Sequence, residues 1–524
     1  MPDTPAALIA QAAAHVRAGA LEDAARFGLA ALAQDPRHFD ALHLLGWLCS
    51  ERGQTADAFC YLTRAAAVRP GVAAMQILRG NALVALGRFQ EAEAAARGIL
   101  AVQPDHFDTA NNLGIALYQQ ERNDEAVVVF RALLTKKPDH APAWFNLAKP
   151  LHQLGRLEEA EAALRAALRH APPTTPPVWI ANIVHRLGEL LIERDRPEEA
   201  LALMRDMAAR RPDLPGLPWN TSLLLLQLGD YASGWKAYEA RWEVKEHDAP
   251  RPDASVLDLA DIAGKRVLVV SEQGHGDIVQ FVRYVPLLAD RGATVSVCTY
   301  NGLKPLLTSL RGVAGVFGED EHEPAYDIVT PVCSLPLAFG TTIETVPAEV
   351  PYLRADPDRV ARWRARLGEK LGPRVGLTWH TTTVSPQRIV RLDDLHAILA
   401  CPNISFHALQ KVIPAEEQAM LPALGLRDHR DDLTDFAETA ALIETLDLVI
   451  TIDTSVAHLA GALGKPVWLM LPHVAEWRWL RVRADSPWYP TARLFRQAAP
   501  GDWRGLSVEI ATALTQLFPS LASR

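Results

Sequence analysis

The chain has 524 residues, 49% of them hydrophobic, with a formal net charge of −9 and a pI of about 6.0. This length suits about three domains, and the acidic balance argues against nucleic acid or a membrane surface as a partner. The N-terminus lacks a signal-peptide pattern and no apolar run is long enough to cross a membrane, so we expect a cytoplasmic protein. The five cysteines show no paired spacing, which predicts free thiols.

The first half of the sequence repeats every 34 residues. The recurring positions are Pro36, Pro70, Pro104, Pro138 and Pro172, with Ala24, Ala58, Ala92, Ala126 and Ala160, and Gly46, Gly80 and Gly114. This period, with small residues where two helices cross, is typical of tetratricopeptide repeats. We therefore predict an α-superhelix of about seven helix pairs over residues 1–245.

Asparagine recurs at one position of the first helix of a repeat, as Asn112, Asn146 and Asn220. This position is expected to face the groove, where an amide can bind a peptide backbone as both donor and acceptor. Other repeats carry Leu44 and Leu78 there, and asparagine is also common on solvated helix surfaces. The array is predicted to bind a protein in this groove.

The second half alternates strands with helices. A charged, proline-bearing linker is predicted over residues 246–264, followed by one lobe over 265–356 and a second over 357–524. Two successive alternating blocks predict two Rossmann-like lobes with a cleft at the carboxyl ends of their strands.

A glycine-rich loop follows the first strand of the first lobe. It reads Gly274–His275–Gly276–Asp277, which is neither the dinucleotide fingerprint nor a Walker loop. The glycines would bring backbone close to a substrate, with His275 and Asp277 projecting into the cleft. Two plainer interpretations stay open, a helix cap for Asp277 and a solvated loop histidine for His275.

A compact βαβ unit spans Leu446–Pro472. A buried strand ends at Ile452, a polar turn follows at Asp453–Thr454–Ser455, and His458 lies one turn inside the next helix. The first N–H groups of a helix can bind an anion or be satisfied by short polar side chains. Both an anion site and a capped structural helix are compatible with this pattern.

These segments resemble the carboxy-terminal region of bacterial tetratricopeptide-repeat glycosyltransferases, which is related to the heptosyltransferases. The resemblance spans both halves and includes SEQGHGDIVQFVRYVPLLADRG, TIDTSVAHLAGALGKPVWLMLP and DSPWYPTARLFRQAAPGDW. It implies a repeat superhelix followed by a two-lobed GT-B domain, a plan also similar to the O-linked N-acetylglucosamine transferases.

The resemblance implies roles for particular residues. Asp277 matches the general base that acts on the acceptor hydroxyl, with His275 as the neighbouring candidate. The donor-binding segment is matched by Asp453, Thr454 and His458, with Ser455 in place of glycine. A nucleotide leaving group on a helix N-terminus needs no metal, so an inverting, metal-independent reaction without a cofactor is expected.

One segment departs from the family. Relatives carry a Trp-Ser-Gly-Asn-Pro motif after the first strand of the second lobe, where this chain reads TWHTTTVSPQRIVRLDDL. We predict His380, Thr381 and Arg388 as substitute donor contacts, joined by Gln410 and Lys411 at the end of the next strand; a plain surface role for Lys411 stays open. The aromatic residues Trp477, Trp479, Trp488 and Tyr489 are expected to pack between elements, and the last helix, Leu506–Leu517, near the first lobe.

The resemblance implies a protein O-glycosyltransferase that modifies Ser or Thr of a protein held by the array, with flagellin as the leading acceptor. The donor expected is a nucleotide-sugar, either a CMP-linked nonulosonic acid or a UDP-sugar. Two alternatives stay open: a non-catalytic scaffold with a degenerate transferase domain, and a transferase for glycan or lipid acceptors.

Overall fold

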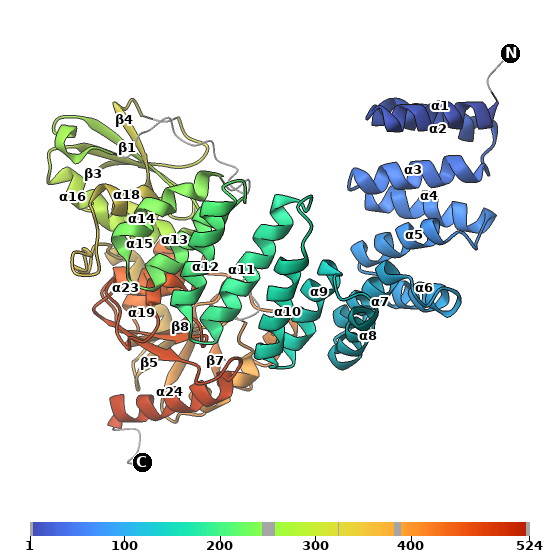
Figure 1. Cartoon of the computed structure of the whole chain (residues 1–524). Coiled ribbons are helices and arrows are strands. Elements are labelled where there is room, and N and C mark those ends of the chain that lie inside the picture. Colours follow the sequence, from blue (N-terminus) through green and yellow to red (C-terminus); the bar gives the residue numbers. More distant parts are fainter. Residues whose placement is uncertain (1–3, 244–256, 323, 382–388, 520–524) are drawn as a thin grey trace. The chain divides into compact units, whose positions relative to one another are not determined.

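The computed structural model describes residues 4–243, 257–322, 324–381 and 389–519 (Figure 1). The chain forms two compact units, Met1–Arg194 and Asp195–Arg524. The first is helical, and the second combines the last helices of the array with two parallel sheets. This confirms the predicted fold class, a helical repeat array followed by an α/β domain. No helix within the described ranges has the length and apolarity that a membrane span requires.

Consecutive helices of similar length form the first unit (Figure 1). They are α1 (Pro5–Arg17), α2 (Leu21–Gln34), α3 (Phe39–Glu51), α4 (Thr55–Val68), α5 (Ala73–Ala85), α6 (Phe89–Val102), α7 (Phe107–Gln119), α8 (Asn123–Lys136), α9 (Ala141–Gln153), α10 (Leu157–His170) and α11 (Pro177–Glu193). Three further helices lie in the second unit: α12 (Pro197–Arg210), α13 (Leu217–Gln227) and α14 (Tyr231–Tyr238). The boundary between the compact units therefore falls inside the predicted array.

Small residues allow the helices of a repeat to approach closely. A Cβ added to Gly114 would lie 2.5 Å from Cζ of Phe130, and one added to Gly46 would lie 2.6 Å from Cγ of Leu62. The turn within each repeat uses a left-handed residue, glycine in most repeats, but Glu121 in one and Asp195 in another, with φ of 61° and 59°. Sequence periodicity thus identified the turn, although glycine is not the only residue that fills it.

The α/β part of the second unit contains ten strands among the described residues. They are β1 (Arg266–Val270), β2 (Thr294–Cys298), β3 (Val313–Phe317), β4 (Ile328–Pro331), β5 (Arg374–Thr378), β6 (Ser405–Ala408), β7 (Leu426–Arg427), β8 (Leu448–Ile452), β9 (Val467–Leu471) and β10 (Ala492–Arg496). The helices are α15 (His275–Phe281), α16 (Val285–Ala289), α17 (Lys304–Leu307), α18 (Leu335–Ala338), α19 (Pro357–Leu367), α20 (His396–Leu399), α21 (Ala415–Gln418), α22 (Phe436–Glu444), α23 (Ser455–Ala462) and α24 (Trp503–Leu517). Short 3₁₀ turns are η1 (Glu239–Glu243), η2 (Leu259–Asp261), η3 (Val282–Tyr284), η4 (Val332–Ser334), η6 (Leu392–Leu395) and η7 (Trp477–Trp479).

The strands form two parallel sheets, in the order β3-β2-β1-β4 and β10-β9-β8-β5-β6-β7. In the larger sheet Thr378 of β5 pairs in register with Thr451 of β8. The segments that follow β5 and β8 therefore leave the sheet side by side at its carboxyl edge, where ligands bind in open parallel sheets.

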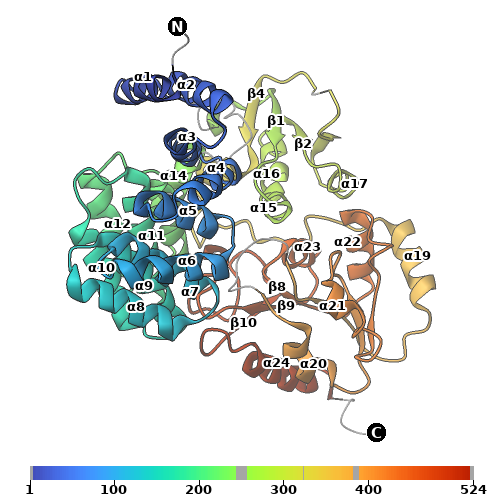
Figure 2. The ribbon, with the colours of Figure 1, turned by 90° about the vertical axis from the view of Figure 1, so that its right-hand side faces the viewer.

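Each face of the larger sheet packs into a different core. Along β9, Val467 and Leu469 face a core that includes α22 and α23, whereas Trp468 and Met470 face one that includes α24. Figure 2 shows α22 and α23 on one side of β8 and β9, and α20 and α24 on the other. Strands buried on both faces need nearly continuous apolar runs, and β8 and β9 are apolar throughout except for Thr451 of β8.

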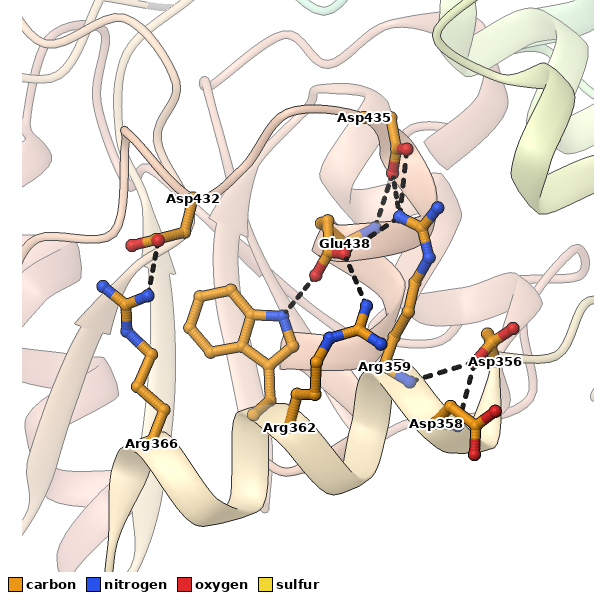
Figure 3. Close-up of polar contacts among 9 residues, drawn as sticks. Asp356, Asp358, Arg359, Arg362, Arg366, Asp432, Asp435 and Glu438 are labelled. Carbon is orange, nitrogen blue, oxygen red and sulfur yellow. Dashed lines mark hydrogen bonds and ion pairs between the residues drawn. The ribbon is translucent and has the colours of Figure 1, made fainter.

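A polar network joins α19 to α22 (Figure 3). Arg359 donates to both carboxylate oxygens of Asp435, at 2.8 and 3.0 Å. Glu438 accepts from Arg359 at 3.0 Å and from Nε1 of Trp363 at 2.8 Å. Phe436 is the first residue of α22, and its ring stacks on His275 of the glycine-rich loop. The network between α19 and α22 therefore supports the helix end that carries this ring.

The end of the chain differs from prediction. The strand β10 was not expected, and it extends the sheet beyond β9. The expected packing of the last helix near the first lobe was wrong: Leu506 and Ile510 of α24 join the core of the larger sheet. Their apolar spacing was visible in the sequence, but it does not say which sheet the helix covers. The four aromatic residues are buried in packing positions, as predicted.

Candidate active site

The glycine-rich loop connects β1 to α15. Gln273, the residue before Gly274, has φ of 61°, a conformation that only a few non-glycine residues adopt. The Asp277 carboxylate accepts a hydrogen bond of 2.9 Å from the Gly274 backbone N–H. Asp277 therefore caps α15, which is the plainer role left open by the sequence. Its other carboxylate oxygen pairs with Arg478.

The loop lies against the start of α23. A Cβ added to Gly276 would lie 2.8 Å from Cδ2 of His458 and 3.5 Å from Cα of Ser455. Glycine is the residue that permits this approach. The structure thus brings together the two polar segments singled out in the sequence, although 177 to 182 residues separate Gly276 from Asp453 and His458 along the chain.

His458 is buried and oriented by its neighbours. Its Nδ1 lies 2.9 Å from the Tyr489 hydroxyl, and its Nε2 lies 4.0 Å from an Asp453 carboxylate oxygen. Its ring stacks on Trp479 with centroids 5.5 Å apart. Trp479 and Tyr489 therefore position His458, a predicted donor-binding residue.

Arg478 is a functional candidate that the sequence analysis missed. It pairs with the second oxygen of Asp277 and with Glu476, and its Nε donates to Gln280 Oε1 at 2.7 Å. Burial disfavours its charge, but the charges of Glu476 and Asp277 outweigh burial and raise the Arg478 pKa above the ordinary arginine value. The signal in the sequence was an arginine between two tryptophans just beyond a buried strand.

The alternative base, His275, is exposed at the loop. Its ring stacks on Phe436 with centroids 5.2 Å apart and lies 4.9 Å from the Tyr300 ring. Partial burial lowers the pKa of His275, opposed by the charge of Glu319. The imidazole is accordingly neutral near pH 7 and able to accept a proton.

The start of α23 has an N-cap residue that does not cap. Thr454 occupies the N-cap position, but its hydroxyl makes no hydrogen bond to the helix and lies 3.3 Å from the Thr451 hydroxyl. Asp453 precedes it and is buried. The capped-helix interpretation is therefore not the arrangement seen for Thr454, and the anion-binding prediction for this helix start stays open.

The remaining predicted donor contacts play varied roles. The Gln410 amide accepts from the backbone N–H groups of Trp379 and His380 and donates to the His380 carbonyl at 2.8 Å, so it fixes the segment after β5. The exposed Lys411 donates to the Arg430 carbonyl at 2.8 Å. Thr381 follows His380 at this edge of the sheet, and Arg388 lies outside the described residues.

The predicted asparagines divide between the units. In the first unit, Asn112 donates to Asn81 at 2.5 Å and Asn146 donates to Asn111 at 3.1 Å. These pairs join α5 to α7 and α7 to α9, so alternate helices carry linked amides. Asn220 belongs to α13 in the second unit. Asn81 and Asn111 were missed because they lie outside the single repeat position compared.

A buried ion pair joins η1 to the segment before the glycine-rich loop. Arg241, fully buried, donates from Nε and Nη2 to both oxygens of Glu272 at 2.9 and 2.7 Å, and from Nη1 to Glu239 at 2.7 Å. The neighbouring Tyr238 hydroxyl donates to Gln273 Oε1 at 3.1 Å. The end of the array therefore helps to set the backbone of the loop.

The fold and this site define a repeat protein that carries a transferase-like α/β domain, and sequence comparisons agree. Residues 27–59, 77–141 and 117–183 match tetratricopeptide-repeat families. Residues 433–468 match glycosyltransferase family 9 (heptosyltransferase). This match covers α22, β8 and α23, including Asp453, Thr454 and His458.

Protein FlbA of Caulobacter vibrioides is 30% identical over 333 residues, 58% of this chain and 55% of FlbA. The alignment thus spans about half the length of that relative. Among solved structures, a tetratricopeptide repeat protein from Parabacteroides merdae is 16% identical, with a TM-score of 0.39, over 46% of this chain and 94% of the other. The pilus biogenesis factor PilW is 19% identical, with a TM-score of 0.35, over 40% and 94%.

Proposed function

We propose that this chain is a GT-B glycosyltransferase that moves a sugar from a nucleotide-sugar to a Ser or Thr hydroxyl of a protein bound by its repeats. The observation that supports the proposal is the close approach of Gly276, in the loop of the two candidate bases, to His458, in the segment that matches a glycosyltransferase family. The repeats favour a protein acceptor over a glycan or lipid, because a small acceptor needs no long groove.

The proposed reaction is an inverting displacement. Asp277 or His275 takes the acceptor proton as the oxygen attacks the anomeric carbon, and the nucleotide phosphate leaves toward the start of α23. Positioned proton removal contributes about 10²–10⁴-fold. Arg478 pairs with Asp277 and Glu476 and is within electrostatic reach of Asp453, so it links the candidate base to the proposed donor segment.

The Arg478 contact affects the choice of base. Both oxygens of the Asp277 carboxylate are already engaged, one by the Gly274 backbone N–H and the other by Arg478, so it must leave a partner to reach an acceptor hydroxyl. His275 has no such cation in contact among the described residues. Comparing Asp277→Asn with His275→Gln, each over a range of pH, separates the two: loss of the acidic limb of the rate profile identifies the base.

The donor proposed is a nucleotide-sugar, a CMP-linked nonulosonic acid or a UDP-sugar, with no metal and no other cofactor. Thermal unfolding with UDP, GDP, ADP and CMP tests it. A ligand of the folded state stabilises by about 2.7 kcal/mol at a hundredfold excess over its Kd. We expect one nucleotide to stabilise the wild type and not Asp453→Ala, with Asp447→Ala, before the same strand, as control.

The scaffold alternative predicts no response to any of the four nucleotides in a folded protein. Flagellin is the acceptor we propose, and deleting the gene should remove a sugar-sized mass from flagellin. Nucleotide binding with unchanged flagellin mass would retain the transferase and reject this acceptor.

A further inference from the structure

Two arginines lie together where a loop crosses the end of β10. Arg496, the last residue of that strand, donates from Nη2 to the carbonyls of Trp479 at 2.5 Å and Arg483 at 3.4 Å. Its Nε and Nη1 are buried, as is Nη1 of Arg481, and none of the three has a hydrogen-bond acceptor among the described residues. Buried donors without acceptors are rare in folded proteins and call for a specific explanation.

The charge environment of the half-buried Arg496 also differs from that of Arg241 and Arg478. Arg241 and Arg478 each contact two carboxylates. Arg496 contacts no carboxylate in the part of the chain that the structure describes. Burial and the nearby charge of Arg481 lower the Arg496 pKa to about 10. Two guanidinium groups near each other, with too few carboxylates, form an electropositive interior that an anion would stabilise.

A cavity of about 470 Å³ lies beside Arg481, with Arg483, Gln227 and Ile343 also in its wall. Arg481 already binds one carboxylate there, that of Asp195, whose side chain is 91% exposed. Asp195 occupies the left-handed position of the turn between α11 and α12, with φ of 59°. Arg481 thus donates to an oxyanion that is carried by an exposed side chain.

The loop that carries Arg481 is itself held in an uncommon conformation. Leu480 has φ of 53° and ψ of −165°, a region almost restricted to glycine. It is anchored on one side by η7 and on the other by the Ala484 carbonyl, which accepts from the Leu494 N–H at 2.8 Å. Backbone strain of this kind persists only where surrounding contacts impose it, and in proteins it is found mostly at ligand and active sites.

We propose that Arg481 and Arg496 form a binding site for a small oxyanion, a phosphate or carboxylate group, at the carboxyl edge of β10. A guanidinium binds either group through two parallel N–H bonds, which supplies acceptors for the unpaired donors. The strand β9 separates β10 from β8, so the site lies about 10 Å along the sheet from the Asp453 segment. It does not depend on the transferase proposal.

Inorganic phosphate is the probe. At constant ionic strength, set with KCl, phosphate should raise the Tm of the wild type, and Arg496→Gln should weaken the apparent Kd by about tenfold or more. Arg493→Gln, an exposed arginine on the same strand, is the matched control and should respond as the wild type does. If Arg496→Gln does not fold, Arg496→Lys keeps the charge, loses the two-pronged geometry and should still weaken binding.

Further arms identify the source of the oxyanion. If the site takes the phosphate of a nucleotide, CMP competes with inorganic phosphate in the wild type; if it takes a free anion, the two stabilise additively. Asp453→Ala should keep its phosphate response, even if the nucleotide proposal fails. An equal response in wild type and Arg496→Gln, or one reproduced by KCl alone, would overturn the site.

Discussion

The repeat unit and the α/β unit use arginine in different ways. In the array, Arg88, Arg122 and Arg156 each pair on the surface with a glutamate three residues later, at the same 34-residue spacing as the prolines. In the α/β unit, Arg241 and Arg478 are buried among carboxylates, some of them distant in sequence. A local surface pair can be lost with little effect, whereas breaking a buried pair leaves a charge in the interior without its partner.

The largest effect should come from breaking a buried pair. Arg241→Ala leaves Glu272 and Glu239 without their cation, and removing one partner of a buried pair costs about 3–5 kcal/mol. Denaturant unfolding followed by tryptophan fluorescence should show the loss in the transition of the second unit. The matched change in the array, Arg156→Ala, should leave its transition where it was. Equal effects of the two variants would contradict the comparison.

Within the array, stability should depend on close packing instead. Gly114→Ala places a methyl group 2.5 Å from Phe130, and overpacking of this kind costs about 1–3 kcal/mol. The expected result is a lower midpoint for the first unit, measured by circular dichroism, with no change in the second. An unchanged midpoint would mean that the helices separate at little cost.

The α/β unit should also lose stability in acid through a buried histidine pair. His407 Nδ1 lies 3.0 Å from His429 Nε2, and burial, with the charges of His429 and nearby arginines, lowers the His407 pKa to about 3. His407 of the unfolded chain binds a proton below about pH 6.5, whereas His407 of the folded protein does so only near pH 3. The free energy of unfolding therefore decreases as the pH is lowered from 6.5 towards 3, and at pH 5.5 this group has lowered it by about 1.4 kcal/mol.

His407→Gln tests this dependence, because glutamine retains hydrogen-bonding groups but does not titrate. The variant should show a flatter stability profile between pH 7 and pH 5 than the wild type. If the two profiles run parallel over this range, the pair is not the source of acid sensitivity.

The smallest effect is expected at a glycine with open space around it. Gly98 lies within α6, and a Cβ added there meets no atom within 4 Å. Gly98→Ala should stabilise the first unit by about 0.5–1 kcal/mol, because alanine loses less backbone freedom in a helix. Gly98→Ala and Gly114→Ala should change the free energy of unfolding in opposite directions, which separates the effect of packing from that of helix propensity. A destabilised Gly98→Ala would contradict this account.

Sequence patterns predicted much of the candidate site, but not its internal contacts. The loop at Gly274–Asp277 and the turn at Asp453–Ser455 were found because short polar residues follow buried strands. Arg478 and Glu476 were missed because they lie in an irregular segment with no period. Gln410 was found, but its amide holds the backbone of His380, a role that depends on where the neighbouring strand ends.

The sequence by itself determined the repeat array, since each repeat makes most of its contacts with adjacent helices and a local period records them. It also determined the parallel strands, because burial on both faces demands continuous apolar runs. Only the tertiary structure decided which loops meet. The contact of Gly276 with His458 and the ion pair between Asp277 and Arg478 join residues through space, and no spacing along the chain encodes such pairs.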